Sequence, residues 1–546
     1  MKKQFHNNII SGHRIIFCLI LCLVVSGMLA RPRKRVRPKI DERIYLVHAD
    51  ELKYDMFGPV PDAQIVKGKV HFRHAGAQLW CDSAYFFQQT NSVKAFGHVR
   101  FVQGDTLSLQ CKYAAYDGQA EMMQARNNVV LKHRRQTLFT DSLNYDRLYD
   151  EAYFFEGGRL IDGRDHLIAD WGRYNLGTRE ASFYYNVKLY NGERLITTDT
   201  LYYDARTAIA HMVGPSKVRS KGTVVTTSDG YYNTHTDRAS LYGRSTVVDK
   251  FKSITGDSLY FNNHTGMNRG FGHVVYIDKK NKNRLDCGKL IYNSKTGRGF
   301  ATRRPLATDY SRKDTLWLHS DTMRIETFNM NTDSMYRKVH CYPHVKVYRT
   351  DVQAICDSMV ASSRDSCLYM YKDPIAWYGT RQLLGEVIQI YMADSTVRQA
   401  EVHGQALSVE KIPQGEYYNQ ISSQDMYAYF LNGNIRRSDA VKNVLSVYYP
   451  VDDKDSTLIG LNYLETDTMR MFMNDQRKLQ RIWTPRAEGT LYPMSQIPPS
   501  KKYLPTFAWF DNARPTSKDD VFVWRGKTAE QKLKPVERKK APLQKI

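Results

Sequence analysis

A short phrase that returns about every thirty residues constrains this chain more than any other feature. The phrase is a small residue, an Asp, a Ser or Thr, an apolar residue, any residue and an aromatic, as in residues 140–145 and 198–203. Its anchor positions are 50, 82, 112, 141, 170, 199, 229, 257, 288 and 321, in steps of 28 to 33 residues. A step this constant predicts a repeat architecture rather than several unrelated globular domains.

Each repeat consists of short strands. Its apolar residue and its aromatic are two positions apart, which is the period of a strand with one buried face. A second alternating run follows a turn, as in residues 97–101, and no stretch of the array has a helical period. Looser copies of the phrase at 357, 386, 425 and 467 lengthen the series. We therefore expect an all-β fold, an elongated array of stacked repeats of about 30 residues.

The N-terminus has the pattern of a secretory signal peptide. Basic residues up to Arg14 precede an apolar run over residues 15–25, and small residues offer a cleavage point near Ala30. The predicted order is a signal peptide over 1–30 and a basic linker over 31–43, with a basic disordered tail over 525–546. We expect export to the periplasm, with the mature protein soluble or peripheral to the inner or outer membrane.

The net charge of +23 does not indicate a nucleic-acid partner. More than half of the positive charge lies in the signal peptide, the linker and the C-terminal tail. Basic arms on an exported protein favour contact with an anionic membrane surface or glycolipid. We expect no nucleic-acid partner.

Four cysteines occupy one position of the repeat, directly before or beside the anchor: Cys81, Cys111, Cys287 and Cys356. Ala or Ser takes this place in other repeats, which favours a small buried side chain, and free Cys behaves as one. Disulfides between Cys81 and Cys111, or between Cys356 and Cys367, stay open because spacing does not decide connectivity.

The sequence lacks the usual motifs of catalysis and cofactor binding. It has no metal-binding pair of His or Cys at typical spacing, no Gly-rich loop before a helix and no GxSxG segment. The recurring Asp is copied in one register through most repeats, which indicates a turn or ladder position rather than a catalytic acid. We expect no enzyme activity, no cofactor and no metal site.

The repeat resembles the OstA-like family of lipopolysaccharide-transport proteins. The resemblance rests on the anchor phrase and on turn–strand pieces such as residues 96–99 and 271–274. It covers residues 44–327 and continues with longer loops in 328–410, leaving 411–524 as a C-terminal β-rich region. It implies an open β-jelly roll, or β-taco, whose apolar groove holds the acyl chains of lipid A.

The resemblance also implies a function and partners. The expected function is to bind and transport lipopolysaccharide in the periplasm during outer-membrane assembly. The implied partners are lipopolysaccharide, other lipopolysaccharide-transport components at the inner or outer membrane, and further copies of the chain in end-to-end self-association.

Residues that share the register of the phrase are candidates to line the groove, because strand residues two apart share a face. About half of them are expected to be packed core. A charged substitution such as Leu201→Asp is expected to weaken lipid binding more than folding. The candidates are Leu52, Tyr54, Phe86, Leu143, Tyr145, Tyr174, Leu201, Tyr203, Leu259, Phe261 and Tyr292.

Two other protein classes stay open. A structural or adhesive exported β-repeat protein would have a filled core without an open groove. A β-solenoid enzyme acting on polysaccharides would interrupt the repeat with a cluster of Asp, Lys and Arg on one face, and the sequence shows no such cluster.

Overall fold

The computed structural model describes residues 43–393, 396–452, 457–476 and 479–525. The predicted signal peptide, the linker up to residue 42 and the tail beyond Arg525 lie outside these residues. The described chain forms 38 strands, and its strand pairs are antiparallel. The predicted all-β array of stacked strands is therefore confirmed. No helix in the described part of the chain is long and apolar enough to cross a membrane.

The chain divides into two compact units, and β8 (Gln136–Asp146) contributes to both. The first unit holds residues up to 134 together with 141–150. Its other strands are β1 (Tyr45–His48), β2 (Glu51–Tyr54), β3 (Gln64–His74), β4 (Ala77–Phe87), β5 (Ser92–Gln103), β6 (Leu107–Asp117) and β7 (Met122–His133).

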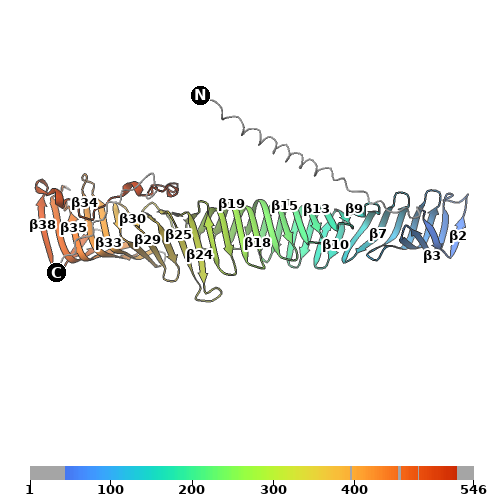
Figure 1. Ribbon diagram of the computed structural model, residues 1–546, viewed down its shortest axis with the longest axis horizontal. Coiled ribbons are helices and arrows are strands. Elements are labelled where there is room, and N and C mark those ends of the chain that lie inside the picture. The colour runs from blue at the N-terminus through green and yellow to red at the C-terminus, as the bar shows by residue number, and fades with distance from the viewer. Residues whose placement is uncertain (1–42, 394–395, 453–456, 477–478, 526–546) are drawn as a thin grey trace, which may run out of the picture. The chain divides into compact units, whose positions relative to one another are not determined.

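The second unit holds residues 135–140 and those from 151 onward. Its early strands are β9 (Glu151–Phe154), β10 (Gly158–Asp162), β11 (Asp165–Ala169), β12 (Trp171–Asn175), β13 (Glu180–Asn191), β14 (Arg194–Asp204), β15 (Ile209–Ser220), β16 (Thr223–Asn233), β17 (Arg238–Val248), β18 (Lys252–Asn262), β19 (Met267–Asp278) and β20 (Asn283–Asn293). Figure 1 shows β13, β15 and β19 as successive members of this series.

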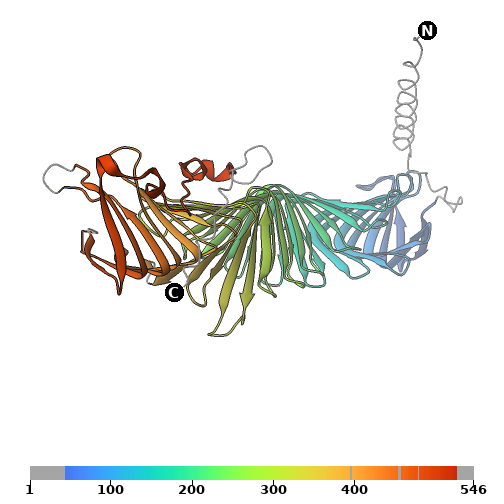
Figure 2. The ribbon, with the colours of Figure 1, turned by 60° about the vertical axis from the view of Figure 1, so that its left-hand side comes forward.

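Shorter strands follow, and long ones return at β33. They are β21 (Arg298–Thr302), β22 (Leu306–Asp309), β23 (Leu316–His319), β24 (Thr322–Phe328), β25 (Tyr336–Tyr342), β26 (Val345–Tyr348), β27 (Val352–Cys356), β28 (Ser358–Ser362), β29 (Cys367–Tyr371), β30 (Ile375–Tyr378), β31 (Arg381–Leu384), β32 (Val387–Ala393), β33 (Thr396–Lys411), β34 (Tyr418–Leu431), β35 (Asn434–Tyr448), β36 (Gly460–Met473), β37 (Leu479–Trp483) and β38 (Ala487–Pro493). Figure 2 shows the hairpin of β24 and β25 extending past its neighbours. Four 3-10 turns follow β38: η1 (Met494–Gln496), η2 (Pro499–Lys501), η3 (Asp511–Ala513) and η4 (Asp520–Phe522).

Long strands have a β-bulge near the middle, and the bulge divides each of them into two halves. In β4 the register shifts between Trp80 and Ser83, and the buried side chains change phase there from Leu79 and Cys81 to Ala84. The shift by one residue turns both halves toward one interior. We call the half of β4 before the bulge (77–81), with its equivalents, the first wall, and the half after it (83–87) the second wall. Their far ends form the mouth.

The recurring Asp lies on the outside of this bend. Asp82 Oδ2 is 2.8 Å from His98 Nδ1, and Gly97 beside it has φ +70°. A Cβ at Gly97 would lie 2.3 Å from the same carboxylate oxygen, so only glycine fits there. Asp257 and His273 repeat the contact at 2.8 Å. This geometry supports the structural interpretation of the repeated Asp.

The stacking of repeats is visible in the pairing of single residues. Tyr174 of β12 and Tyr203 of β14 are both aligned with Ala181 of β13, so the aromatics of these neighbouring repeats stand in one column.

Cysteines beside the anchor are inward and buried, and the six cysteines of the described chain are free thiols. Burial raises the pKa of Cys81 and of Cys111 to about 12.

Candidate functional site

The interior of the first unit is filled by side chains. The ring centroids of Phe72 on the first wall and Phe86 on the second wall are 5.4 Å apart. Phe101 lies 6.2 Å from both Tyr116 and Tyr145 of the second wall. These contacts join the two walls directly, so this part of the interior is ordinary packed core.

A buried arginine closes the mouth of the first unit. Arg147 donates from Nη1 to Tyr116 Oη at 2.7 Å, from Nε to Gln103 Oε1 at 2.9 Å and from Nη2 to the carbonyl of Ala75 at 3.2 Å. Its Nη1 is also 3.3 Å from Glu121. Gln103 and Ala75 end the first wall, whereas Tyr116 and Arg147 end the second. We call such a polar contact across the mouth a latch.

The second unit begins with latches of different composition. Tyr203 Oη donates to Asp162 at 3.2 Å and to Asp165 at 3.0 Å, and Thr234 Oγ1 donates to Asp165 at 2.7 Å. Burial and the two carboxylates raise the pKa of Tyr203, so its hydroxyl stays a donor. The buried aspartates belong to the first wall, and their partners belong to the second.

One more latch follows. Tyr232 Oη donates to Asn191 Oδ1 at 3.2 Å, and Arg194 Nη1 lies 2.7 Å from Asp237 Oδ1. Residues 158–237 are therefore called the latched stretch. Between residues 238 and 325, all of which the structure describes, no further latch joins the walls. We call residues 238–325 the open stretch.

Inward positions that are buried early in the latched stretch become accessible in the open stretch, and the change begins at Val218 and Val225, which are half-buried in the same row. Ile196 in β14 is 1% exposed, whereas Ile254, two repeats later at the same place in β18, is only half-buried. Tyr203 and Phe261 form a second pair with the same difference. Leu259, close to the bulge, stays fully buried. Exposure of inward residues therefore rises from the bulge toward the mouth, and we call this accessible inward surface the apolar slot.

Both walls contribute apolar side chains to this slot. Ile254, Leu285 and Leu290 each pack one flank against the buried core and leave the rest accessible. Tyr276 of β19 lies between Ile254 and Leu285 on the first wall, and burial raises its pKa to about 12. Phe261 completes the set on the second wall. Such a surface is apolar, inward-facing and incompletely filled by the protein's own side chains.

The structure distributes the eleven sequence-predicted residues over three environments. Phe261 and Tyr292 are half-buried in the open stretch. Leu52 and Tyr54, in the edge strand β2, are 55% and 56% exposed. The remaining seven are buried core: Phe86, Leu143, Tyr145, Tyr174, Leu201, Tyr203 and Leu259.

Two of these placements correct the sequence-based expectation. Leu201 is fully buried, so Leu201→Asp is now expected to unfold the protein rather than to act mainly on lipid binding. Leu52 and Tyr54 do not face an enclosed interior, because within the described residues β2 pairs with β3 alone.

The phrase found residues of the second wall and missed those of the first. Ile254 and Leu285 lie on the other side of the bulge, where the alternation in β18 and β20 changes phase by one residue. A single period-2 register extended through these strands would have placed both on the outside. Tyr276 keeps the parity of Gly270 and Val274 in β19, and the second alternating run of its repeat carried the signal for it.

The outer face of the first wall has a cover of its own in the later strands. Gln382 of β31 is 0% exposed; it donates to the carbonyl of Ala508 and accepts from the amide of Phe510, both at 2.8 Å. Gln420 of β34 does the same with the carbonyl of Lys502 and the amide of Leu504, at 2.8 and 2.9 Å.

The covering segment, residues 502–525, is called the C-terminal strap. Its last part is fixed by buried Lys346 of β26, which donates to the carbonyls of Asp520 and Val523 at 2.9 and 2.5 Å. Apolar side chains beneath the strap form a second core with Leu504, Ala508 and Ala513, separate from the interior. Figures 1 and 2 show the red strap beside the orange strands.

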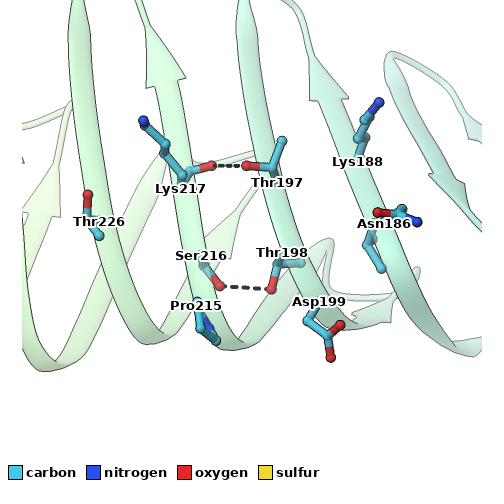
Figure 3. A pocket seen from close by; sticks show the side chains of 10 residues that line it. Asn186, Lys188, Thr197, Thr198, Asp199, Pro215, Ser216, Lys217 and Thr226 are labelled. Carbon is cyan, nitrogen blue, oxygen red and sulfur yellow. Dashed lines mark hydrogen bonds between the residues drawn. The ribbon is translucent and has the colours of Figure 1, made fainter.

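A depression of about 450 Å³ lies on the outside of β13 to β16. Figure 3 shows Lys188, Lys217 and Thr197 around it, with Thr197 Oγ1 bonded to the carbonyl of Lys217 at 3.2 Å. Buried Val187, Thr198 and Ser216 also contribute to its lining, and no residue of the open stretch does. In the described residues no group of His, Cys, Asp and Glu has metal-binding geometry.

Comparison with known proteins gives one family match. Residues 41–199 match the family model described as OstA-like protein, which reaches from the first repeats to the anchor Asp199 in β14. A search of curated proteins found no match. The matched segment contains the first unit and the beginning of the second, and the same bulged strands continue beyond it.

Proposed function

We propose that the protein is a periplasmic, non-enzymatic carrier of lipopolysaccharide, and the match of residues 41–199 to the OstA-like family model supports this proposal. The acyl chains of the lipopolysaccharide would enter the apolar slot of the open stretch. The observation that supports this proposal is the half-buried state of Ile254, Phe261 and Tyr276, whereas Ile196, Tyr203 and Leu189 are buried at the corresponding positions of β13 and β14.

Burial of acyl chains supplies sufficient free energy. Each methylene group removed from water contributes about 0.8 kcal/mol. A few methylenes against Ile254, Leu285 and Tyr292 offset the cost of ordering a chain. The polar headgroup would stay at the mouth, where the walls end and water is accessible.

The structural-rod alternative applies to part of the molecule only. It requires a filled interior, and the first unit and the latched stretch up to β14 satisfy that requirement. The open stretch does not, since its inward apolar residues remain accessible. This difference favours a carrier in which the open stretch binds the lipid and the packed repeats are structural.

Partner proteins would engage the terminal strands. In the first unit Leu52 and Tyr54 are exposed on edge strand β2, and in the second unit Ile482 and Leu491 are exposed on β37 and β38. Unpaired strand edges accept a further strand through main-chain hydrogen bonds. We propose that transport components, or further copies joined end to end, add strands there.

Photocrosslinking in cells tests the lipid proposal. A photoreactive residue at Phe261 should yield lipopolysaccharide adducts, while the same residue at its outward neighbour Tyr260 should not. A second matched pair is inward Tyr276 and outward Val275. Equal crosslinking at both members of each pair, or none at either, would remove the proposal.

A further inference from the structure

Two consecutive turns at the mouth of the open stretch are rich in lysine. They end the first wall between β17 and β18 and between β19 and β20. Each turn is longer than the tight turns of the latched stretch, such as the one at Gly163. Their lysines are all exposed: Lys250, Lys252, Lys279, Lys280 and Lys282.

The carboxylates of these turns are already engaged with the turn itself. Asp249 Oδ1 accepts the amides of Phe251 and Lys252 at 2.8 and 2.7 Å. Asp278 accepts the amide of Asn281 at 3.0 Å and its side-chain nitrogen at 2.9 Å. Although burial acts in the opposite direction, these hydrogen bonds lower the pKa of Asp278, which therefore stays ionised.

The lysine charges have no matching ion pairs. None of the five forms a salt bridge with another described residue. The positive charge of Lys252 helps to lower the pKa of Asp278, but the two side chains form no ion pair. The preceding turn of the first wall differs, because Lys221 there is paired with Glu193 at 3.3 Å. The lysines of the first-wall turns are therefore without ion pairs in the open stretch, which begins where the latches end.

The same turns adjoin the apolar slot. Lys252 is two residues from inward Ile254, and Asp278 is two residues from inward Tyr276. Phe251 is 44% exposed at the mouth, with Lys250 Nζ 5.0 Å from its ring centroid. An amphiphile with its chains against Ile254 and Tyr276 would therefore present its headgroup to the lysines.

We propose that the five lysines form a headgroup site for a phosphorylated acyl amphiphile, and this inference rests on the proposed lipid-carrier function. Phosphate is the chemistry that fits, because several unpaired ammonium groups over two neighbouring turns complement a compact polyanion, and Lys binds phosphate as a point charge. The site selects by headgroup charge, whereas the slot holds the acyl chains.

The test compares two forms of one lipid on the full chain. Lipid A with two phosphates and the same lipid with both phosphates removed are titrated against wild type and against a variant with all five lysines changed to Gln. Wild type should bind the phosphorylated form at least tenfold more tightly, with an affinity that falls as salt rises. The variant should bind both forms with the affinity of the dephosphorylated lipid.

Three controls separate the outcomes. Lys188→Gln with Lys217→Gln, on the outer face, should leave the preference unchanged, and replacement of the five lysines by Arg should retain it. If the five-fold Gln variant does not fold, Lys279→Gln with Lys280→Gln should still reduce the preference.

A wild type that binds both lipids equally, or a folded Gln variant that keeps the preference, would overturn the headgroup site. Inorganic phosphate alone binding as tightly as phosphorylated lipid A would also overturn it, since that identifies a free-anion site. If neither lipid binds wild type, the carrier function fails, and the headgroup site fails with it.

Discussion

The latched stretch (158–237) and the open stretch (238–325) are built from the same repeat but differ in their interiors. Both have bulged strands, a recurring anchor at the bend and fully buried leucines beside it, Leu201 and Leu259. They differ at the mouth, where Asp165 and Tyr203 bridge the walls in one stretch and lysine-rich turns stand apart in the other. The comparison teaches that the repeat builds the walls, and that the residues at their far ends decide whether the walls meet.

The largest expected effect comes from the same charge placed in each stretch. Leu201→Asp puts an unpaired carboxylate into packed core and should cost more than about 4 kcal/mol of unfolding free energy. Phe261→Asp, two repeats further along and near the mouth, should leave folding largely intact because water reaches the charge, but should abolish acyl binding. Urea unfolding and lipopolysaccharide crosslinking measure the two effects. Equal losses of stability would mean that the open stretch is packed core as well.

Removal of a latch should have the next largest effect. Asp165→Ala leaves Tyr203, Thr234 and Asn191 without their shared acceptor and should lower the unfolding free energy by about 2–3 kcal/mol. Asp199→Ala, an exposed anchor in β14, is the control and should change it by less than about 1 kcal/mol. If Asp165→Ala folds and gains acyl crosslinking at Ile196, the latch alone separates the two stretches.

The C-terminal strap provides a smaller, local test. Gln382→Leu deprives the carbonyl of Ala508 and the amide of Phe510 of their partners, which should cost about 1–3 kcal/mol. Hydrogen exchange should accelerate in residues 502–514 and stay unchanged in β18 and β19. Gln399→Leu, at a half-buried position bonded to Glu401, is the matched control. Faster exchange in β18 and β19 would show that the open stretch depends on the strap.

The smallest effect is a pH dependence from Lys346. Burial lowers its pKa to about 8 from an ordinary value of 10.5, even though Asp520 acts in the opposite direction. The unfolded chain therefore binds more protons between about pH 8 and 10.5, so the Lys346 contribution makes stability rise with pH in this window. The urea midpoint of Lys346→Met should show a weaker rise between pH 7.5 and 9.5 than wild type. An identical rise in both would exclude Lys346 as its source.

Most of the fold could be predicted from the sequence, but only part of the site. The period of about thirty residues specified the strands and the column that contains Tyr174 and Tyr203. All eleven groove candidates lie in the second wall, since its apolar residue and aromatic share one register, but only Phe261 and Tyr292 are half-buried in the open stretch. The first-wall residues Ile254 and Leu285 were missed because a bulge changes the phase of the alternation within β18 and β20.

The sequence by itself determined the all-β repeat, the structural role of the recurring Asp and the preference for a small residue beside it, because each depends on contacts within a repeat or with its nearest neighbour. Only the tertiary structure decided which repeats are filled and which are open. Thr234 and Asp165 are 69 residues apart, and Lys346 and Asp520 are 174 apart. No local pattern links such pairs. Thr234 meets Asp165 because stacked strands bring the far ends of the two walls together at the mouth, whereas Asp520 meets Lys346 because the C-terminal strap folds back over the outer face of the first wall.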